Sequence, residues 1–333
     1  MRTINTSLLL GMALLMQLTG CGREQAQQQQ QQQGIAETAA YIVAVNNPLL
    51  YFARRLTGDD IEVRLLAPED IDPATWQPTV ADVLQLQGAE LVLLNGAGYS
   101  SWLDKIAISS GKLVATSEAV QDSWIELSDT LTHSHGPVGE HAHGGYAFTT
   151  WMDMSLARGQ AEAVATALQQ RWPRRSDAIA ANLAALSADI DGLDDGYRQQ
   201  ALSLAGRQLI YSHPVYQYFQ RRYQLPGYSL HWEPGAMPTE QQWEALRQQL
   251  SDTALFIWEG EPAAPIVERM ASLGLEFVVL DPAANTSGKD WLAVQRENIA
   301  RLSAANKGSG LSHQWLREKL TEIFKQEEKV AET

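Results

Sequence analysis

Two rounds of alternating strand and helix patterns constrain the fold of this chain more than any other feature of its sequence. In the first round, strands are expected at residues 41–45, 61–66, 90–94 and 112–115, and helices at 48–56, 79–88 and 99–106. In the second, strands are expected at 208–211, 227–230, 254–258 and 276–280, and helices at 215–223, 239–250, 263–273 and 291–302. Strand–helix–strand units at this spacing are typical of parallel sheets. The sequence therefore predicts an α/β fold with two αβ domains.

A proline-free stretch at 176–204 follows the first round and predicts one long helix. It comes after a helix at 153–170 and the break Arg171-Trp172-Pro173, and Ser176 is the expected N-cap. A helix of this length extends roughly 40 Å at 1.5 Å per residue, long enough to run along two domains. We expect it to restrict hinge motion, so that a ligand is released through small domain shifts or loop ordering.

The N-terminus carries an export signal. Arg2 precedes an apolar core at 8–16, and Leu-Thr-Gly stands before Cys21, the only cysteine. Leu-Thr-Gly-Cys resembles a bacterial lipobox, which implies lipidation of Cys21 and an extracytoplasmic, membrane-anchored protein; the alternative is a soluble secreted protein in which the cysteine is accidental. The expected organisation is a signal peptide at 1–20, a Gln-rich disordered tether at 21–39, an N-terminal αβ lobe at 40–150 with a His-rich loop at 132–145, a helical region at 151–205 with the linking helix at 176–204, a C-terminal αβ lobe at 206–303 and a charged tail at 304–333.

The charge balance narrows the class of partners. The chain has 39 acidic and 25 basic residues, a formal net charge of −14 and a pI near 4.9. Nucleic-acid recognition needs a basic face, so nucleic acid is not an expected partner. An acidic surface is compatible with the collection of cations.

Four of the seven histidines stand close together in a glycine-rich stretch, as His133, His135, His141 and His143. Imidazoles at this density, on a backbone too rich in glycine to fold by itself, predict affinity for a borderline metal such as zinc. The alternatives are an ordinary solvated loop and a chance cluster.

Polar side chains follow the predicted strands, where ligands bind in parallel sheets. They are Glu69, Asp70 and Asp72 in the first round, and His213, His231, Glu233, Glu259, Glu261 and Asp281 in the second. Imidazoles and carboxylates together suit Zn²⁺ or Mn²⁺ in a cleft between the domains. Several also have a purely structural interpretation. His213 could cap a helix, His231 could pack with Trp232, Glu259 and Glu261 could lie in a solvated loop, and Asp281 could lie in a turn.

An enzyme is not expected. His213 with Glu233 or Glu261 would form a general acid–base pair. However, the sequence contains no nucleophile elbow, no Walker-type phosphate loop and no HExxH motif.

The order of several local segments resembles the zinc/manganese-type solute-binding proteins of bacterial ABC importers, the ZnuA/TroA-like group, over residues 40–302. The segments are Asp72-Pro73…Trp76…Pro78…Asp82, Asn95-Gly96-Ala97-Gly98…Trp102, Trp151-Met152-Asp153, His213…Tyr218-Phe219…Tyr223 and Leu280-Asp281-Pro282. The resemblance implies a TroA-like periplasmic binding protein fold and a monomer. It also implies zinc or manganese as a transported ligand, captured between the lobes and delivered to a membrane permease with its ATPase.

The same resemblance implies four metal ligands, of which this chain keeps two. His213 and Asp281 match, whereas Ala74 and Thr149 stand where the family has histidines. Substitute ligands could come from the four loop histidines or from His231, Glu233, Glu259 and Glu261. The alternatives are a fold adapted to a non-metal solute and a metallochaperone that passes metal onward.

Overall fold

The computed structural model describes residues 40–127, 145–286 and 288–306, and the backbone at 133–134 and 140–141. The fold described below is that of the chain from Tyr41 onward. The predictions for the signal peptide, Cys21, the tether, His135, His143 and residues 307–333 lie outside the described residues, as do the side chains of His133 and His141. In the described part of the chain, no helix combines the length and the apolar character needed to cross a membrane.

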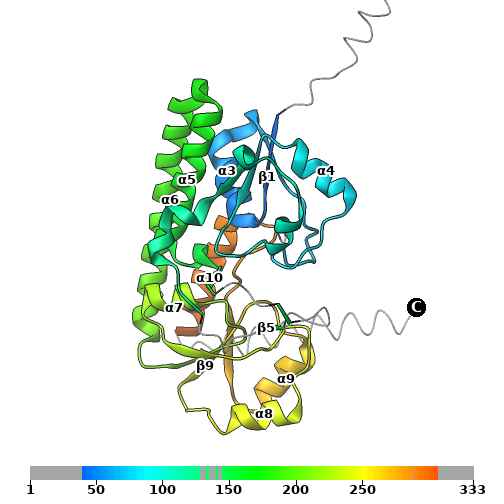
Figure 1. Cartoon of the computed structure of the whole chain (residues 1–333). Helices are drawn as coiled ribbons and strands as arrows, with labels where there is room; N and C mark the ends of the chain where they lie inside the picture. Colours follow the sequence, from blue (N-terminus) through cyan, green and yellow to red (C-terminus); the bar gives the residue numbers. More distant parts are fainter. Residues whose placement is uncertain (1–39, 128–132, 135–139, 142–144, 287, 307–333) are drawn as a thin grey trace, which may run out of the picture. The chain divides into compact units, whose positions relative to one another are not determined.

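Two four-stranded parallel sheets form the centre of the fold (Figure 1). The first has the order β2-β1-β3-β4, and its strands are β1 (Tyr41–Ala44), β2 (Glu62–Leu65), β3 (Leu91–Leu94) and β4 (Leu113–Ala115). The second has the order β10-β9-β7-β8, and its strands are β7 (Gln208–Tyr211), β8 (Gly227–Ser229), β9 (Ala254–Trp258) and β10 (Glu276–Val279). If the strands of each half are counted in chain order, both sheets have the second strand beside the first, followed by the third and the fourth. The prediction of an α/β fold with two parallel sheets is confirmed.

Helices connect the strands and pack on the sheets. They are α3 (Asn47–Thr57), α4 (Val80–Gly88), α5 (Met154–Arg171), α6 (Ser176–Leu204), α7 (Gln217–Tyr223), α8 (Glu240–Arg247), α9 (Ala264–Ser272) and α10 (Trp291–Asn306). Local sequence explains several boundaries. The Thr79 hydroxyl accepts from the Asp82 N–H and the Asp82 carboxylate accepts from the Thr79 N–H, a reciprocal cap that starts α4. Gly58, with φ of 62°, follows α3 and allows the chain to leave the helix.

Two expectations about helices need correction. Ser176 is the first residue of α6 and its N-cap is Arg175, because the 3₁₀ turn Pro173–Arg175 leads directly into the helix. The segment expected to be helical at 99–106 forms only the 3₁₀ turn Ser101–Lys105. Within the expected range, Ser100 has φ of −111° and ψ of 57° and Ile106 is extended, so neither residue is helical.

The long helix α6 packs against elements from both halves of the chain. Its 29 residues include a buried stripe that is spaced three, four or seven residues apart: Ile179, Leu186, Ile190, Leu193, Tyr197, Ala201 and Leu204. It lies against α5, α3 and α10. A Cβ on Gly196 would approach Ile299 of α10 to 2.8 Å, so α6 and α10 are in close contact there.

The largest buried apolar cluster is continuous from the first sheet to the second. It contains Val43 of β1, Leu168 of α5, Leu186 of α6 and Leu255 of β9. A smaller cluster lies on the other side of the second sheet, around Trp232, Trp243, Phe256 and Trp258. The shared cluster, together with α6, fixes the carboxyl ends of the strands that carry the predicted ligands.

Candidate metal centre

His213, Glu233 and Glu259 leave three adjacent strands, β7, β8 and β9. Ser212 connects these three strand ends. Its hydroxyl accepts from the Glu259 N–H at 3.2 Å, and its carbonyl accepts from the Trp232 N–H at 2.8 Å. Because β7 lies between β9 and β8, the imidazole is placed between the two carboxylates.

These three side chains form a group with metal-ligand chemistry. One ligand atom from each lies within 4.8 Å of the others. His213 Nδ1 is 3.7 Å from Glu233 Oε1 and 3.8 Å from Glu259 Oε1. In a tetrahedral site with bonds of about 2.1 Å, ligand atoms are roughly 3.4 Å apart, so the two distances to His213 are within a few tenths of an ångström of this value. One imidazole and two carboxylates suit a borderline divalent ion.

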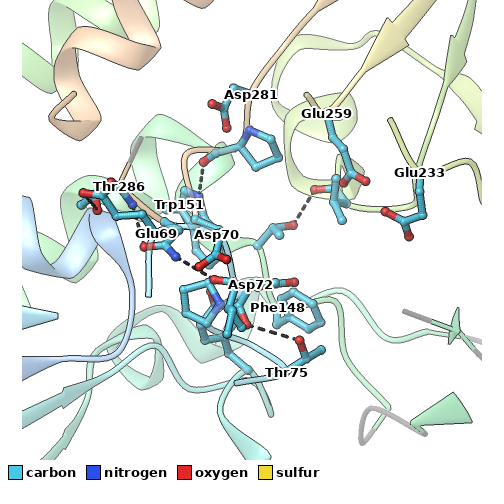
Figure 2. A pocket seen from close by; sticks show the side chains of 18 residues that line it. Glu69, Asp70, Asp72, Thr75, Phe148, Trp151, Glu233, Glu259, Asp281 and Thr286 are labelled. Atoms are coloured by element: carbon cyan, nitrogen blue, oxygen red, sulfur yellow. Dashed lines mark hydrogen bonds between the residues drawn. The ribbon is translucent and has the colours of Figure 1, made fainter. Parts of the chain in front are cut away.

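Glu233 and Glu259 line a cavity of about 530 Å³ to which residues from both halves of the chain contribute (Figure 2). His213 is 1% exposed and is not among the lining residues, but its Nδ1 lies within 4 Å of both carboxylates. Six of the lining residues are acids: Glu69, Asp70 and Asp72 on one side, and Glu233, Glu259 and Asp281 on the other. Among the described residues that line it there is no lysine or arginine.

Burial and neighbouring charges favour the protonated form of Glu259. Burial raises the pKa of Glu259 to about 8, and the charges of Glu233, Asp72 and Asp281 add to this effect. Burial also raises the pKa of Asp281, although the hydrogen bond from the Ala283 N–H opposes the change. A cation in the cavity would relieve this repulsion, so the cavity favours a positively charged ligand.

The structure separates the other predicted ligands from this group. Asp281 lines the cavity, but its Oδ1 accepts from the Ala283 N–H at 2.7 Å and it is not part of the three-residue group. Glu261 forms an ion pair with Arg301 at 3.2 Å and does not line the cavity. His231 is exposed, and the centre of its ring is 5.6 Å from that of His213.

Ala74 and Thr149 are buried, each at 3% exposure. The Thr149 hydroxyl donates to the Val215 carbonyl at 2.6 Å, and the Ala74 N–H donates to Asp72 Oδ1 at 2.9 Å. Thr149 therefore links the two halves of the chain by a hydrogen bond.

The His-rich segment is described only at its base. The short strands β5 (His133–Ser134) and β6 (Glu140–His141) pair antiparallel, with His133 opposite His141. Next to the segment, the Tyr218 hydroxyl of α7 donates to the Ala147 carbonyl at 2.8 Å and accepts from the Ile125 N–H at 3.1 Å. The base of the loop is thus hydrogen-bonded to the half of the chain that carries His213.

Two aromatic residues of the cavity, Tyr99 and Phe148, were not among the predicted site residues. Tyr99 follows the third strand of the first sheet, so the rule that ligands bind beyond strand ends could have found it. Phe148 follows the His-rich segment, and no sequence signal distinguishes it from a core residue.

Residues 42–305 match the family described as zinc-uptake complex component A, periplasmic. The chain belongs to this family. Curated relatives include the metal ABC transporter substrate-binding lipoprotein FimA of Streptococcus parasanguinis, 24% identical over 77% of this chain and 82% of its own length. Another is the high-affinity zinc uptake system protein ZnuA of Bacillus subtilis, 23% identical over 87% of this chain and 94% of its own length. Both relatives are named as parts of metal transport systems.

Solved structures of the family share the fold. A crystal structure of ZnuA is 25% identical with a TM-score of 0.65, and the match covers 80% of this chain and 99% of that one. The periplasmic zinc-binding protein TroA of Treponema pallidum is 18% identical with a TM-score of 0.62, over 80% of this chain and 99% of that one. The predicted family and the TroA-like fold are confirmed.

Proposed function

We propose that this protein is the extracytoplasmic solute-binding component of a bacterial metal ABC importer, with zinc or manganese as its transported ligand. The observation that carries this proposal is the group of His213, Glu233 and Glu259, whose two carboxylates line an acidic cavity. Relatives of the same family are named for zinc uptake and, in the case of PsaA of Streptococcus pneumoniae, as a manganese transporter lipoprotein. The ion is cargo, and the proposal includes no catalytic step.

The residues of the chain suggest how capture proceeds. The surrounding carboxylates attract a divalent ion, and Glu233 and Glu259 lie beside the His213 imidazole to bind it. Asp281 adds negative charge at the edge of the site without belonging to the three-residue group. The loop histidines His133, His135, His141 and His143 would raise the local metal concentration.

Delivery requires a membrane partner, which we propose to be a permease with its ATPase. Lipidation of Cys21 and the Gln-rich tether would keep a monomeric binding protein near that permease. Because α6 packs against both halves of the chain, release would follow small shifts of the cavity walls.

Metal analysis with matched variants tests the proposal. The exported protein is desalted and its zinc and manganese are measured, and binding is then followed by isothermal titration calorimetry. We expect about one equivalent of metal, with loss of binding in His213→Ala and a loss of at least about tenfold in affinity in Glu259→Gln, because each removes a ligand. Glu261→Gln is the matched control, since Glu261 pairs with Arg301 and should leave the affinity unchanged.

The outcomes separate the alternatives. If the wild type binds neither zinc nor manganese, the metal-carrier proposal is rejected. If Glu261→Gln weakens binding as much as Glu259→Gln does, the ligand assignment is wrong. Deletion of 133–143 tests the loop: we expect weaker binding, and unchanged affinity would make the loop accessory.

A further inference from the structure

Asp281 is an acid of the cavity wall that lies outside the three-residue group and still acts on it. It follows β10 and lines the cavity together with Glu233 and Glu259. Burial is the main cause of the raised pKa of Glu259, and the charge of Asp281 contributes to it after those of Glu233 and Asp72. A carboxylate whose charge acts on Glu259 also acts on a cation held beside Glu259. The contacts that fix Asp281 therefore bear on the affinity of the site.

A side-chain amide from α10 holds the backbone of Asp281 on both sides. Asn298 Oδ1 accepts from the Asp281 N–H at 3.0 Å, and Asn298 Nδ2 donates to the Asp281 carbonyl at 2.7 Å. Residues of neighbouring antiparallel strands exchange two bonds in the same way. In the described part of the chain β10 is an edge strand, and its inner side continues with the bond from the Leu280 N–H to the Trp258 carbonyl at 2.8 Å. The Asn298 amide thus takes the place of a neighbouring strand on the outer side.

A contact from the other direction ties this point to the segment that carries His213. Tyr216 lies three residues after His213, is fully buried, and donates from its hydroxyl to the Leu280 carbonyl at 2.7 Å. The residue before Asp281 is therefore held by the chain that presents the imidazole. Asn298 and Tyr216 together set the position of Asp281 relative to His213.

The Asp281 carboxylate is divided between a turn and the cavity. Its Oδ1 accepts from the Ala283 N–H at 2.7 Å and closes the turn. Ala283 has φ of 57°, a left-handed conformation that alanine rarely adopts, so the surroundings must hold the turn in place. Oδ2 forms no hydrogen bond with the described residues. A clamp on the Asp281 backbone therefore keeps one oxygen in the turn and the other available to a cation in the cavity.

Helix α10 is a firmly packed source for this amide. Asn298 is fully buried, and one end of the same helix is fixed by Trp291, which packs edge-to-face on Phe52 of α3 at 5.1 Å. A buried amide is costly unless it is hydrogen-bonded, and an apolar side chain is the usual occupant of such a helix face. Because the Asn298 amide bonds Asp281 through both its oxygen and its nitrogen, holding that residue explains a polar side chain here.

We propose that Asn298 is a positioning residue of the metal site, which clamps the backbone of Asp281 and so holds its carboxylate where it strengthens the binding of a divalent cation. This inference rests on the proposed metal-binding function and adds to it a residue that does not line the cavity. Asn298 acts on the ion through Asp281 alone. Without the clamp the turn relaxes and the carboxylate moves, so affinity falls while His213, Glu233 and Glu259 remain in place.

A double-mutant cycle on zinc affinity tests the inference. The metal-free full chain is titrated with zinc by calorimetry as wild type, Asp281→Asn, Asn298→Ala and the double variant. We expect each single substitution to weaken zinc binding by at least about fivefold, as loss of residues behind the ligands does in other metal sites. The double variant should bind no more than about twofold more weakly than Asp281→Asn, because Asn298 has no further effect once the carboxylate is gone.

Gln295→Ala is the matched control. Gln295 is also a fully buried amide of α10, one turn before Asn298, and its Oε1 accepts from the Tyr197 hydroxyl at 2.6 Å. We expect this variant to lose stability in denaturant unfolding, as Asn298→Ala does, but to keep its zinc affinity within about twofold of the wild type. Circular dichroism confirms folding, and if Asn298→Ala does not fold, Asn298→Ser, which is a smaller change, replaces it in the cycle.

The inference and the metal-carrier function fail in different ways. If the wild type binds zinc but Asn298→Ala or Asp281→Asn binds it equally well, the positioning role is overturned and the metal-carrier function stands. The same holds if Asn298→Ala weakens binding by the same factor with and without the Asp281 carboxylate. An equal loss of affinity in Gln295→Ala would trace the effect to general loosening of α10 and also overturn the role. If the wild type binds no zinc, both proposals fall.

Discussion

Glu259 is a residue at which function and stability oppose each other. Its carboxyl group is buried at the end of β9, and burial followed by the charges of Glu233, Asp72 and Asp281 raises its pKa to about 8. A group with these neighbours destabilises the metal-free fold whenever it is ionised. The same carboxylates attract a cation, so the repulsion that destabilises the metal-free fold is a consequence of building the binding site.

Replacing Glu259 by glutamine should therefore stabilise the metal-free protein. We expect Glu259→Gln to raise its free energy of unfolding by about 1–3 kcal/mol, because a neutral amide removes the repulsion. Thermal unfolding of metal-free protein at neutral pH measures this. Glu261→Gln, which breaks the pair with Arg301, should change stability by less than about 1 kcal/mol. A lower melting temperature for Glu259→Gln than for the wild type would contradict the argument.

Gly227 shows a purely steric requirement at the residue scale. A Cβ there would lie 2.4 Å from the Leu209 carbonyl oxygen on the neighbouring strand β7. We expect Gly227→Ala to cost about 1–3 kcal/mol of stability, through overpacking. Gly235 has nothing within 4 Å of the same position, so Gly235→Ala is the matched control and should be nearly neutral in chemical denaturation. Equal effects of the two substitutions would refute the steric explanation.

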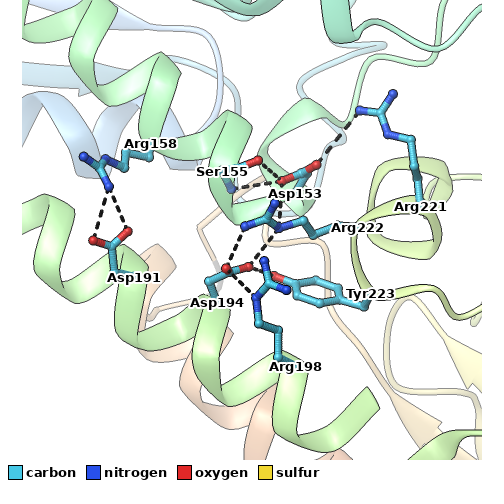
Figure 3. Close-up of polar contacts among 9 residues, drawn as sticks. All are labelled: Asp153, Ser155, Arg158, Asp191, Asp194, Arg198, Arg221, Arg222 and Tyr223. Carbon is cyan, nitrogen blue, oxygen red and sulfur yellow. Dashed lines mark hydrogen bonds and ion pairs between the residues drawn. The ribbon is translucent and has the colours of Figure 1, made fainter. Parts of the chain in front are cut away.

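Helix α6 is joined to α7 by a polar group centred on Asp194 (Figure 3). The Asp194 carboxylate accepts from Arg222 at 2.7 and 3.0 Å, from Arg198 at 2.9 Å and from the Tyr223 hydroxyl at 3.0 Å. Burial alone would raise its pKa, but the hydrogen bonds from Arg222 and Arg198 outweigh burial and lower it. The group therefore binds α6 to the half of the chain that carries His213.

Because the pKa of Asp194 is lower in the folded than in the unfolded chain, its contribution has a defined pH dependence. The stabilisation is complete above the unfolded value near 4 and is lost as the pH falls through the lower folded value. Asp194→Asn should cost about 1.5–3 kcal/mol at pH 7, and the difference from the wild type should shrink at acid pH. Denaturant unfolding at pH 7 and near pH 3 measures both.

Asp191 provides the control on the same helix. It pairs with Arg158 at 3.2 Å, but its side chain is 58% exposed, so solvent screens the interaction. We expect Asp191→Asn to change stability by less than about 1 kcal/mol at either pH. A loss in Asp194→Asn that does not depend on pH would show that its carboxylate is not the source of the stability.

Individual elements show how far sequence reasoning reaches. The bounds of α6, β7 and β9 agree with the prediction, because proline, glycine and apolar periodicity all act locally. Ser176 was placed one position wrong at the start of α6, since the preceding 3₁₀ turn made Arg175 the cap. The helix expected at 99–106 was wrong because Ser100 and Ile106 do not have helical backbone angles.

The site was only partly predictable, for a topological reason. The sequence identified polar residues after each strand, and all six acids of the cavity were among them. It could not rank them, because their distances depend on the strand order. Glu233 and Glu259 leave strands on either side of β7, whereas Asp281 leaves β10, which is separated from β7 by β9. Asp281 lines the same cavity, and its expected role as a metal ligand stays a prediction.

At the scale of the whole fold, several features connect the two sheets. The largest apolar cluster is continuous between them, and α6 packs against α3 and α10. Hydrogen bonds from Thr149, Trp151 and Asn285 cross from one half of the chain to the other beside the cavity. Wide closure would break these contacts and expose part of the shared core.

Metal binding should therefore move the two halves very little. We expect the distance between spin labels at Val80→Cys on α4 and Met237→Cys beyond β8 to change by less than about 2 Å when zinc is added. Both positions are exposed, at 80% and 51%, and Cys21→Ser removes the only natural cysteine. Pulsed electron–electron double resonance measures the distribution of distances between the two spin labels. Asn285→Ala, which releases the acidic loop, should broaden it in the metal-free state. A zinc-dependent shift of several ångströms in the otherwise unchanged protein would mean that the lobes do hinge, and that α6 and the crossing hydrogen bonds do not hold them.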